Sequence, residues 1–211
     1  MKETKAVMSK LTRRWLVIIV GALVLGGIVA VGICVHSAHY VEGFAEVVPG
    51  RLYRCRQPRG EQWGLLRRHN IHVVVNLRPE GENPKDFQEE RQACQAAGVE
   101  SVNIPIGDPL PDYDQIRQFI RVVRASKGPV LLHCEHGRNR TGYMIATYRV
   151  VAQNWSPDKA WDEICEYSSE PQGQKKDNLM GILSTLQRDR AAWLAQTDPN
   201  AQATTAASPA K

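Results

Sequence analysis

The sequence predicts an α/β fold, in which a central and mostly parallel β-sheet is flanked by helices, with one transmembrane helix near the amino terminus. Short apolar runs rich in β-branched residues alternate with helical patterns along most of the chain, and this order is typical of a parallel sheet with helices on both faces. A single long uncharged run accounts for the transmembrane helix. The 211 residues are 43% hydrophobic and 23% charged, which is ordinary for one folded domain with additional segments and excludes wholesale disorder.

The uncharged run covers residues 15–35, and at 1.5 Å per residue it is long enough to cross a hydrocarbon core of about 30 Å. Basic residues outnumber acidic ones in residues 1–14. The positive-inside rule therefore keeps this segment in the cytoplasm and places the rest of the chain beyond the cell (inner) membrane. A cleavable signal peptide is the alternative, although its apolar core would span only about 7–15 residues. Small residues at Ala22, Gly26 and Ala30 predict a weak homodimer through this helix.

The predicted soluble domain covers residues 44–195 and follows a juxtamembrane linker over 36–43. Strands are expected where apolar or β-branched residues gather between turn residues, at 44–48, 52–53, 71–77, 99–106 and 129–133. Helices are expected where apolar residues recur every three or four positions, at 61–70, 86–97, 114–126, 140–152, 156–167 and 177–195. Residues 196–211 are rich in Ala and Thr without periodicity, which predicts a disordered tail.

The predicted strand over 129–133 leads directly into a polar loop, residues 134–139, and then into an apolar helical pattern. A loop between a strand and a helix start points backbone N–H groups and the positive end of the helix dipole at one spot, which is an anion site. Gly137 lets this loop curl. Cys134 should lose its proton near neutral pH there, because the helix terminus and nearby cations stabilise a thiolate. With Arg140 placed to grip two phosphate oxygens, the loop suits nucleophilic displacement at phosphorus.

His133, Cys134, Arg140 and Thr141 meet every fixed position of the signature H-C-x5-R-[ST]. The chain thus resembles the cysteine-dependent protein tyrosine and dual-specificity phosphatases, and the resemblance implies their compact phosphatase fold. It also implies that Cys134 is a nucleophile that forms a cysteinyl phosphate and that Arg140 binds phosphate and stabilises the transition state. Thr141 would help to expel the thiolate, and His133 would orient and tune the cysteine. The backbone amides that hold phosphate would come from the loop residues Glu135, His136, Gly137, Arg138 and Asn139.

The resemblance further implies a general acid, an Asp in the loop after the preceding strand, because the leaving oxygen needs a proton. Asp108 is our candidate, since it follows the predicted strand over 99–106 directly and lies in a proline-containing loop. The alternative is that Asp108 only forms a turn and that Asp112 or Asp114 is the acid or a helix cap.

The resemblance extends over residues 44–193. The stretch VVPGRLYRCRQP is similar to the opening strands of bacterial and fungal dual-specificity-like phosphatases, and VVVNLR is similar to their next strand. Cys55 stands where Ser is usual, and it is either a small buried residue or a resolving or disulfide partner for another cysteine. The expected substrate is a phosphotyrosine protein, and phosphoinositide lipids or inositol phosphates are the alternative.

Other functions fit parts of the sequence less well. A metal site over His133, Cys134 and His136 is disfavoured because two loop arginines would repel a cation, and no cofactor is expected. A rhodanese-like sulfurtransferase would leave Asp108 idle, and a membrane-tethered module that only binds phosphate groups would not need a nucleophile. A nucleic-acid partner is not expected, because most of the net charge of +5 lies in residues 1–14.

Overall fold

The structure is a computed structural model that describes residues 15, 18–30, 40–107, 110–168 and 173–199. The chain divides into two units, Met1–Tyr40 and Val41–Lys211. The sheet and every element labelled below belong to the second unit. Most of the predicted disordered tail over 196–211 lies outside the described residues.

The prediction of a transmembrane helix over residues 15–35 is wrong. In the part of the chain that the structure describes, no helix is long and apolar enough to cross a membrane. Residues 16–17 and 31–35 of the predicted span lie outside the described residues. The finding overturns the predicted single-pass location with an extracytoplasmic domain, and the membrane anchor and the helix-mediated homodimer lose their basis with it.

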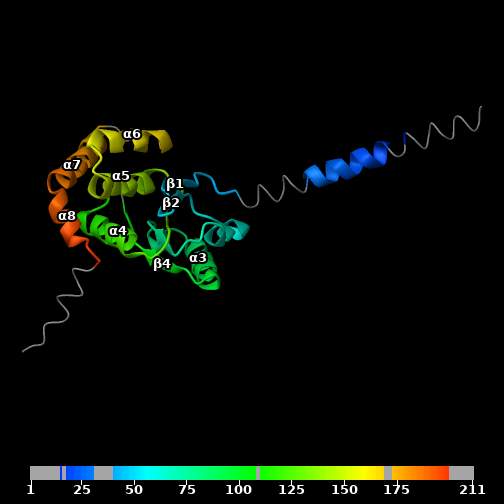
Figure 1. Cartoon of the computed structure of the whole chain (residues 1–211), viewed down its shortest axis with the longest axis horizontal. Helices are drawn as coiled ribbons and strands as arrows, with labels where there is room; N and C mark the ends of the chain where they lie inside the picture. The colour runs from blue at the N-terminus through cyan, green and yellow to red at the C-terminus, as the bar shows by residue number, and fades with distance from the viewer. Residues whose placement is uncertain (1–14, 16–17, 31–39, 108–109, 169–172, 200–211) are drawn as a thin grey trace, which may run out of the picture. The chain divides into compact units, whose positions relative to one another are not determined.

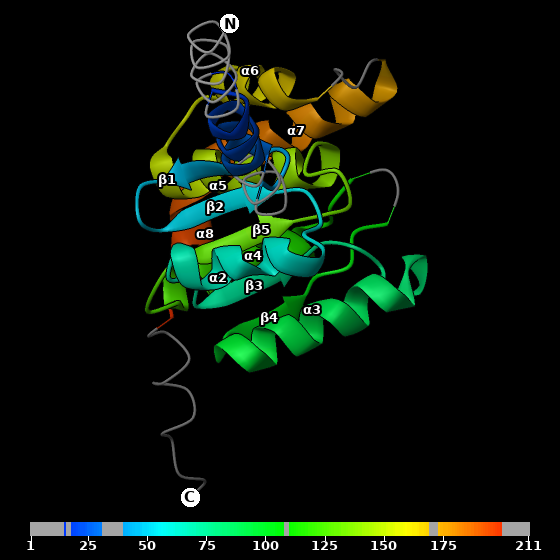
Figure 2. The same cartoon turned by 90° about the vertical axis from the view of Figure 1, so that its right-hand side faces the viewer.

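Five short strands form one sheet in the order β1-β2-β5-β3-β4, which can be followed from top to bottom in Figure 2. The strands are β1 (Ala45–Val48), β2 (Leu52–Cys55), β3 (Val73–Asn76), β4 (Glu100–Asn103) and β5 (Val130–His133). β1 runs antiparallel to β2, and the other three pairings are parallel. The predicted α/β fold with a mostly parallel sheet is therefore confirmed. Because β5 is the middle strand, the loop that follows it emerges between the ends of β2 and β3.

Helices cover both faces of the sheet (Figure 1 and Figure 2). One face carries η1 (Gly60–Gly64), α2 (Leu65–Arg68) and α3 (Pro84–Ala97), which η2 (Glu80–Glu82) precedes. The other face carries α4 (Tyr113–Ala125), α5 (Asn139–Gln153), α6 (Pro157–Tyr167), α7 (Gln174–Arg188) and α8 (Arg190–Gln196).

The alternation of side chains along the strands separates the two apolar cores. Val73 and Val75 of β3 pack with the cluster that includes α4 to α8, whereas Val74 between them packs with α2 and α3. Successive strand residues point to opposite faces, so a continuous valine run serves both cores. α5 is the central helix of the larger cluster, and most of its residues are buried. Its first turn, next to the loop after β5, is therefore held rigidly.

Several predicted elements differ in length from the structure, and two of them show a physical reason. The strand predicted over 99–106 ends at Asn103, because the next N–H groups, those of Ile104 and Ile106, donate to the successive carbonyl oxygens of Asn76 and Leu77 instead of to alternate ones, which breaks the regular parallel ladder. The helix predicted over 177–195 is divided at Asp189, whose φ of −97° and ψ of 18° end α7 and begin α8. The change of direction brings Trp193 to 5.8 Å from the Tyr113 ring of α4, measured between ring centroids.

Candidate active site

The loop between β5 and α5, residues 134–138, has the strand–loop–helix arrangement that the sequence predicts. Cys134 directly follows β5 and is 4% exposed. A cavity of about 330 Å³ opens here, and it is lined by Cys134, Glu135, His136, Arg138, Asn139 and Arg140. The first N–H groups of α5 have no partner within the helix, and the helix dipole is positive at this end. The cavity therefore favours an anion.

The end of β2 holds the underside of this loop. The backbone N–H of Gln57 donates to the carbonyl oxygen of Glu135 at 3.1 Å, and Nη2 of Arg54 donates to the carbonyl oxygen of Gly137 at 2.7 Å. In a planar trans peptide, the carbonyl oxygen and the following N–H point in opposite directions. The N–H group after each of these carbonyls therefore points away from β2, as an anion-binding loop requires.

Gly137 is the residue that lets the loop approach β2 so closely. Its φ is +67°, in the left-handed region, and a Cβ atom there would lie 2.5 Å from the backbone carbonyl carbon and oxygen of Cys55. A side chain at position 137 would thus be strained by its backbone conformation and would collide with main-chain atoms that cannot move aside. The loop has this shape because this position is glycine.

Arg140, the predicted phosphate clamp, is fixed by a chain of buried and half-buried charges. Its Nη1 lies 2.8 Å from Oε1 of Glu82, and the other oxygen of Glu82 lies 3.2 Å from Nε of Arg78. Arg78 is 1% exposed, and its Nη1 lies 2.7 Å from Oδ2 of Asp86 in α3. The guanidinium of Arg140 is therefore anchored to η2 and α3 from the side.

A second buried network lies behind the cysteine. His133 is fully buried, and its Nε2 lies 3.3 Å from Oε2 of Glu90 in α3. Glu90 also accepts hydrogen bonds from Nδ2 of Asn76 at 2.7 Å and from Oγ of Ser101 at 3.2 Å. Burial raises the pKa of the Glu90 carboxyl, but its contacts with His133, Asn76 and Gln57 together outweigh burial and place this pKa below its usual value. The pair fixes the backbone next to Cys134.

The remaining predicted site residues have different outcomes. Thr141 is fully buried in the first turn of α5, and its hydroxyl has no hydrogen-bond partner among the described residues. Asp108 lies outside the described residues. Asp112 is the N-cap of α4, where its carboxylate accepts a backbone N–H at 2.8 Å. Asp114 forms an ion pair within the same helix. Both alternatives to Asp108 are thus engaged in the start of α4.

Cys55, Cys94 and Cys134 are buried and form no disulfide bond in the part of the chain that the structure describes. Cys55 is fully buried, and this burial raises the pKa of its thiol well above the usual range. In the described ranges, no group of three or more His, Cys, Asp or Glu side chains is arranged to hold a metal ion.

Sequence reasoning missed the residues that support the loop from distant parts of the chain. They are Arg54, Gln57, Arg78, Glu82 and Glu90, which come from β2, the loops around it and β3, η2 and α3. The sequence marks these residues only weakly, because none of them stands at a fixed spacing from Cys134 in a recognisable motif. Arg54 and Gln57 do lie within the stretch VVPGRLYRCRQP, so that stretch was the place to search.

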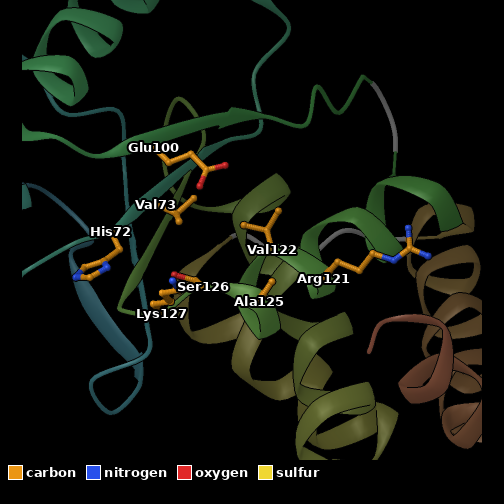
Figure 3. A pocket seen from close by; sticks show the side chains of 8 residues that line it. All are labelled: His72, Val73, Glu100, Arg121, Val122, Ala125, Ser126 and Lys127. Carbon is orange, nitrogen blue, oxygen red and sulfur yellow. The ribbon is translucent and has the colours of Figure 1, made fainter. Parts of the chain in front are cut away.

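A larger cavity of about 460 Å³ lies at the opposite end of the sheet. Figure 3 shows its lining residues on β3, β4 and α4, among them Val73, Glu100 and Val122. The hydroxyl of Ser126 in its lining donates to the carbonyl oxygen of Gly128, and the side chain of Arg121 donates two hydrogen bonds to the carbonyl oxygen of Gln196. The cavity beside Cys134 is therefore the better candidate for a reaction site.

A family model described as "PTP-NADK: DSP-PTPase phosphatase fused to NAD+ Kinase" matches residues 37–181, which include the loop and all the residues that support it. The chain belongs to this family. Membership of the DSP-PTPase family confirms the resemblance to cysteine-dependent phosphatases that the signature from His133 to Thr141 indicates.

Curated relatives of this DSP-PTPase chain include two kinds of phosphatase. Dual specificity protein phosphatase TpbA of Pseudomonas aeruginosa is 34% identical over 115 residues, which cover 54% of this chain and 49% of that protein. Inositol diphosphatase DSP5 of Arabidopsis thaliana is 30% identical over 121 residues, which cover 56% of this chain and 58% of that protein. The chain thus spans about half the length of the curated relatives it matches.

Solved structures share the fold. A P. aeruginosa TpbA variant in complex with pTyr is 25% identical with a TM-score of 0.58, and the match covers 71% of this chain and 90% of that one. The core catalytic domain of the PP-IP phosphatase SIW14 from Saccharomyces cerevisiae, in complex with citrate, is 25% identical with a TM-score of 0.59. That match covers 73% of this chain and 95% of the SIW14 chain.

Proposed function

We propose that this chain is a phosphatase that hydrolyses phosphate monoesters through a cysteinyl-phosphate intermediate, with its catalytic domain in residues 44–195. The observation that carries the proposal is a buried Cys134 at an anion-binding loop whose carbonyls are tied back to β2, with Arg140 anchored beside it by Glu82. Membership of a phosphatase family and the anchored guanidinium favour hydrolysis over a sulfurtransferase or a module that only binds phosphate.

In the first step, the Cys134 thiolate attacks phosphorus, and an S–P bond forms as the bond to the leaving oxygen breaks. Asp108 gives its proton to that oxygen. The guanidinium of Arg140 and the backbone amides of residues 135–139 stabilise the charge on the other three phosphate oxygens. His133 holds the cysteine in place through its contact with Glu90.

In the second step, water attacks the phosphorus of the cysteinyl phosphate. Asp108 takes a proton from this water, the S–P bond breaks and inorganic phosphate is released. The buried hydroxyl of Thr141 helps the sulfur to leave as a thiolate. No step requires a metal ion or an organic cofactor, so turnover should persist in the presence of a chelator.

We propose phosphotyrosine proteins as the substrate class. A TpbA variant whose structure is 25% identical is in complex with pTyr, and Glu135 adds a negative charge to the lining of the cavity that disfavours very highly charged substrates. A panel of phosphotyrosyl peptide, phosphoseryl peptide, phosphoinositide and inositol diphosphate tests this choice. Higher kcat/KM on phosphotyrosyl peptide than on the other three is the expected result, and a preference for inositol diphosphate would reverse the assignment.

Inositol phosphates are the second candidate class, because relatives named inositol diphosphatases include DSP5 of Arabidopsis thaliana and SIW14 of Saccharomyces cerevisiae. One feature of the rim fits a second phosphate group. Nη2 of Arg138, a cavity-lining residue, lies 3.2 Å from Oε1 of Glu42, and the other oxygen of Glu42 pairs with Arg56. The Glu42 carboxylate therefore pairs with Arg56 and Arg138, the two cations that a second phosphate group would contact.

Replacing Glu42 tests this candidate directly. Glu42→Gln frees Arg56 and Arg138 from a negative charge, so kcat/KM for inositol diphosphate should rise by roughly 3-fold or more relative to an aryl phosphate, an effect of the size of an exposed ion pair. Steady-state kinetics at low ionic strength measures it. An equal change for both substrates would count against a second-phosphate site at this rim.

A further inference from the structure

Arg54, in β2, carries a positive charge that the fold buries without a carboxylate partner. Its side chain is 1% exposed. Nη2 donates to the carbonyl oxygen of Gly137 at 2.7 Å, whereas Nε and Nη1 have no hydrogen-bond partner among the described residues. The guanidinium carbon lies 3.7 Å from the ring centroid of Tyr167 in α6. A buried cation is costly unless a negative charge lies beside it.

The other deeply buried arginines of the domain show the usual solution to this problem. Arg78 is equally buried and pairs with Asp86 at 2.7 Å. Arg149 is 9% exposed and pairs with Glu163 at 2.5 Å. In the part of the chain that the structure describes, Arg54 has no carboxylate within ion-pair distance. Its counter-charge must therefore come from another kind of group.

Four titratable groups act on the Arg54 charge, and they lie on three parts of the fold. They are Tyr167 and Glu163 of α6, Cys134 of the loop and Cys55 of β2. Burial lowers the pKa of the Arg54 guanidinium, and a negative charge on any of the four raises it again.

Three of these groups are poor counter-charges. Glu163 already pairs with another arginine. Tyr167 presents its ring face to the guanidinium, and this cation–π contact supplies no full negative charge. Burial raises the pKa of the Cys55 thiol, so this thiol stays protonated. Of the four groups, this leaves the thiolate of Cys134 as the negative charge that stabilises the buried Arg54 guanidinium.

The other charged or titratable groups around Cys134 lie in β5, in α3 and on the opposite side of the loop from Arg54. They are His133, Glu90, Glu135, His136, Arg138 and Arg140. The arginines of this set line the cavity, where an incoming phosphate would engage them, whereas Arg54 is not among the lining residues. Arg54 therefore does not bind an incoming phosphate, and its positive charge acts on the loop both before and after a phosphate enters the cavity.

We propose that Arg54 is a positioning residue of this site, whose buried guanidinium stabilises the thiolate form of Cys134 from beneath the loop while its hydrogen bond holds the carbonyl of Gly137 out of the cavity. The inference rests on the proposed function, in which Cys134 is the nucleophile. It explains why a cation that neither touches the cavity nor pairs with a carboxylate is retained in the core.

The test measures the thiolate of Cys134 without using phosphatase turnover. The full chain is reacted with iodoacetamide across a range of pH, and mass spectrometry follows the peptide that contains Cys134, so that other cysteines do not contribute. The neutral variants Arg54→Met and Arg54→Gln should move the midpoint of the rate–pH curve upward by roughly 1 pH unit or more, the shift expected when a nearby opposite charge is removed. Arg54→Lys, which keeps the charge, should remain closer to wild type.

Arg51→Met is the matched control, because it removes a half-buried arginine that, like Arg54, donates to backbone carbonyl oxygens, here those of Ser126 and Val123, but lies at the opposite end of β2 from Cys134. It should leave the midpoint unchanged. Thermal melting shows which variants fold. A purely structural role for Arg54 predicts a lower melting temperature and an unchanged midpoint in the folded protein.

Each outcome supports or overturns the proposed role of Arg54 or the proposed function. A midpoint that stays at the wild-type value in either folded neutral variant overturns the proposal, and so does failure of both neutral variants to fold. A wild-type midpoint near that of an ordinary thiol, about pH 8.5, would instead contradict the proposed function itself. A low wild-type midpoint that rises only in the neutral Arg54 variants supports the inference.

Discussion

Glu90 is the residue whose loss should damage the site without changing the cavity lining. Its carboxylate is 2% exposed and holds His133, Asn76 and Ser101. Glu90→Ala leaves these buried polar groups without their partner, so it should destabilise the fold by about 2–4 kcal/mol. Urea unfolding measures this, with Glu90→Gln as the variant that keeps a polar partner and should lose less. Equal stability of Glu90→Ala and wild type would show that the network contributes nothing.

The same carboxylate predicts a pH dependence. The pKa of Glu90 lies below its usual value in the folded chain, because its contacts with His133, Asn76 and Gln57 together outweigh the opposing effect of burial. Glu90 therefore adds stability above the pKa of the unfolded chain, about 4.3, and this addition is lost as the pH falls through the lower folded pKa. Wild type should thus lose stability more steeply than Glu90→Gln below about pH 5. Parallel curves of unfolding free energy against pH would contradict the assignment.

Asp108 is the proposed proton donor. Asp108→Ala should slow the first step most for substrates with poor leaving groups, because a weakly basic leaving oxygen departs without a proton. We expect a loss of roughly 100-fold or more for an alkyl or phenyl phosphate and a smaller loss for a nitrophenyl phosphate. Comparison of kcat/KM across a series of leaving groups measures this difference. A uniform loss would point to another acid.

At the scale of elements, the loop after β5 depends on the absence of a side chain at Gly137. Gly137→Ala would place a Cβ 2.5 Å from backbone atoms of Cys55 at a φ of +67°. The loop must then move away from β2, which releases its carbonyls and misdirects its N–H groups. We expect a fall in kcat/KM of roughly 100-fold or more, because these groups stabilise charge in the transition state.

Gly181→Ala is the matched control for this change. Gly181 lies inside α7, and a Cβ there would meet nothing within 4 Å. Alanine in a helix interior should stabilise the fold by up to about 1 kcal/mol and leave the kinetics unchanged. If the two variants lost activity to the same extent, the close approach at Gly137 would not be the cause.

The elements also show what a sequence can predict. β5, the loop and the start of α5 are contiguous, so the pattern from residue 129 to 142 predicts their order correctly, and the anion site there stays a prediction. Arg54, Glu82 and Glu90 reach the same site from stretches 44 or more positions away in the chain, and only the pairing of β2, β3 and β5 brings them there. Local periodicity contains no information about such contacts. Asp108 remains a sequence prediction.

At the scale of the whole molecule, the basic character of the chain and its site have separate origins. Most of the net charge of +5 lies in residues 1–14, whereas the charges at the site are anchored arginines and carboxylates in the second unit. Hydropathy over residues 15–35 predicted a membrane span because it counts apolar residues along the sequence. In the part of the chain that the structure describes, no helix is long and apolar enough to cross a membrane.

The central claim is that this molecule hydrolyses phosphate monoesters with Cys134 as nucleophile. The most direct test is the rate at which the full chain hydrolyses an aryl phosphate in the presence of a chelator, compared with Cys134→Ser. Wild type should hydrolyse the substrate, with a burst of phenol release followed by slower phosphate release when the intermediate accumulates. Cys134→Ser should lose at least roughly 1,000-fold in rate. A Cys134→Ser variant that hydrolyses the substrate at the wild-type rate would contradict the central claim.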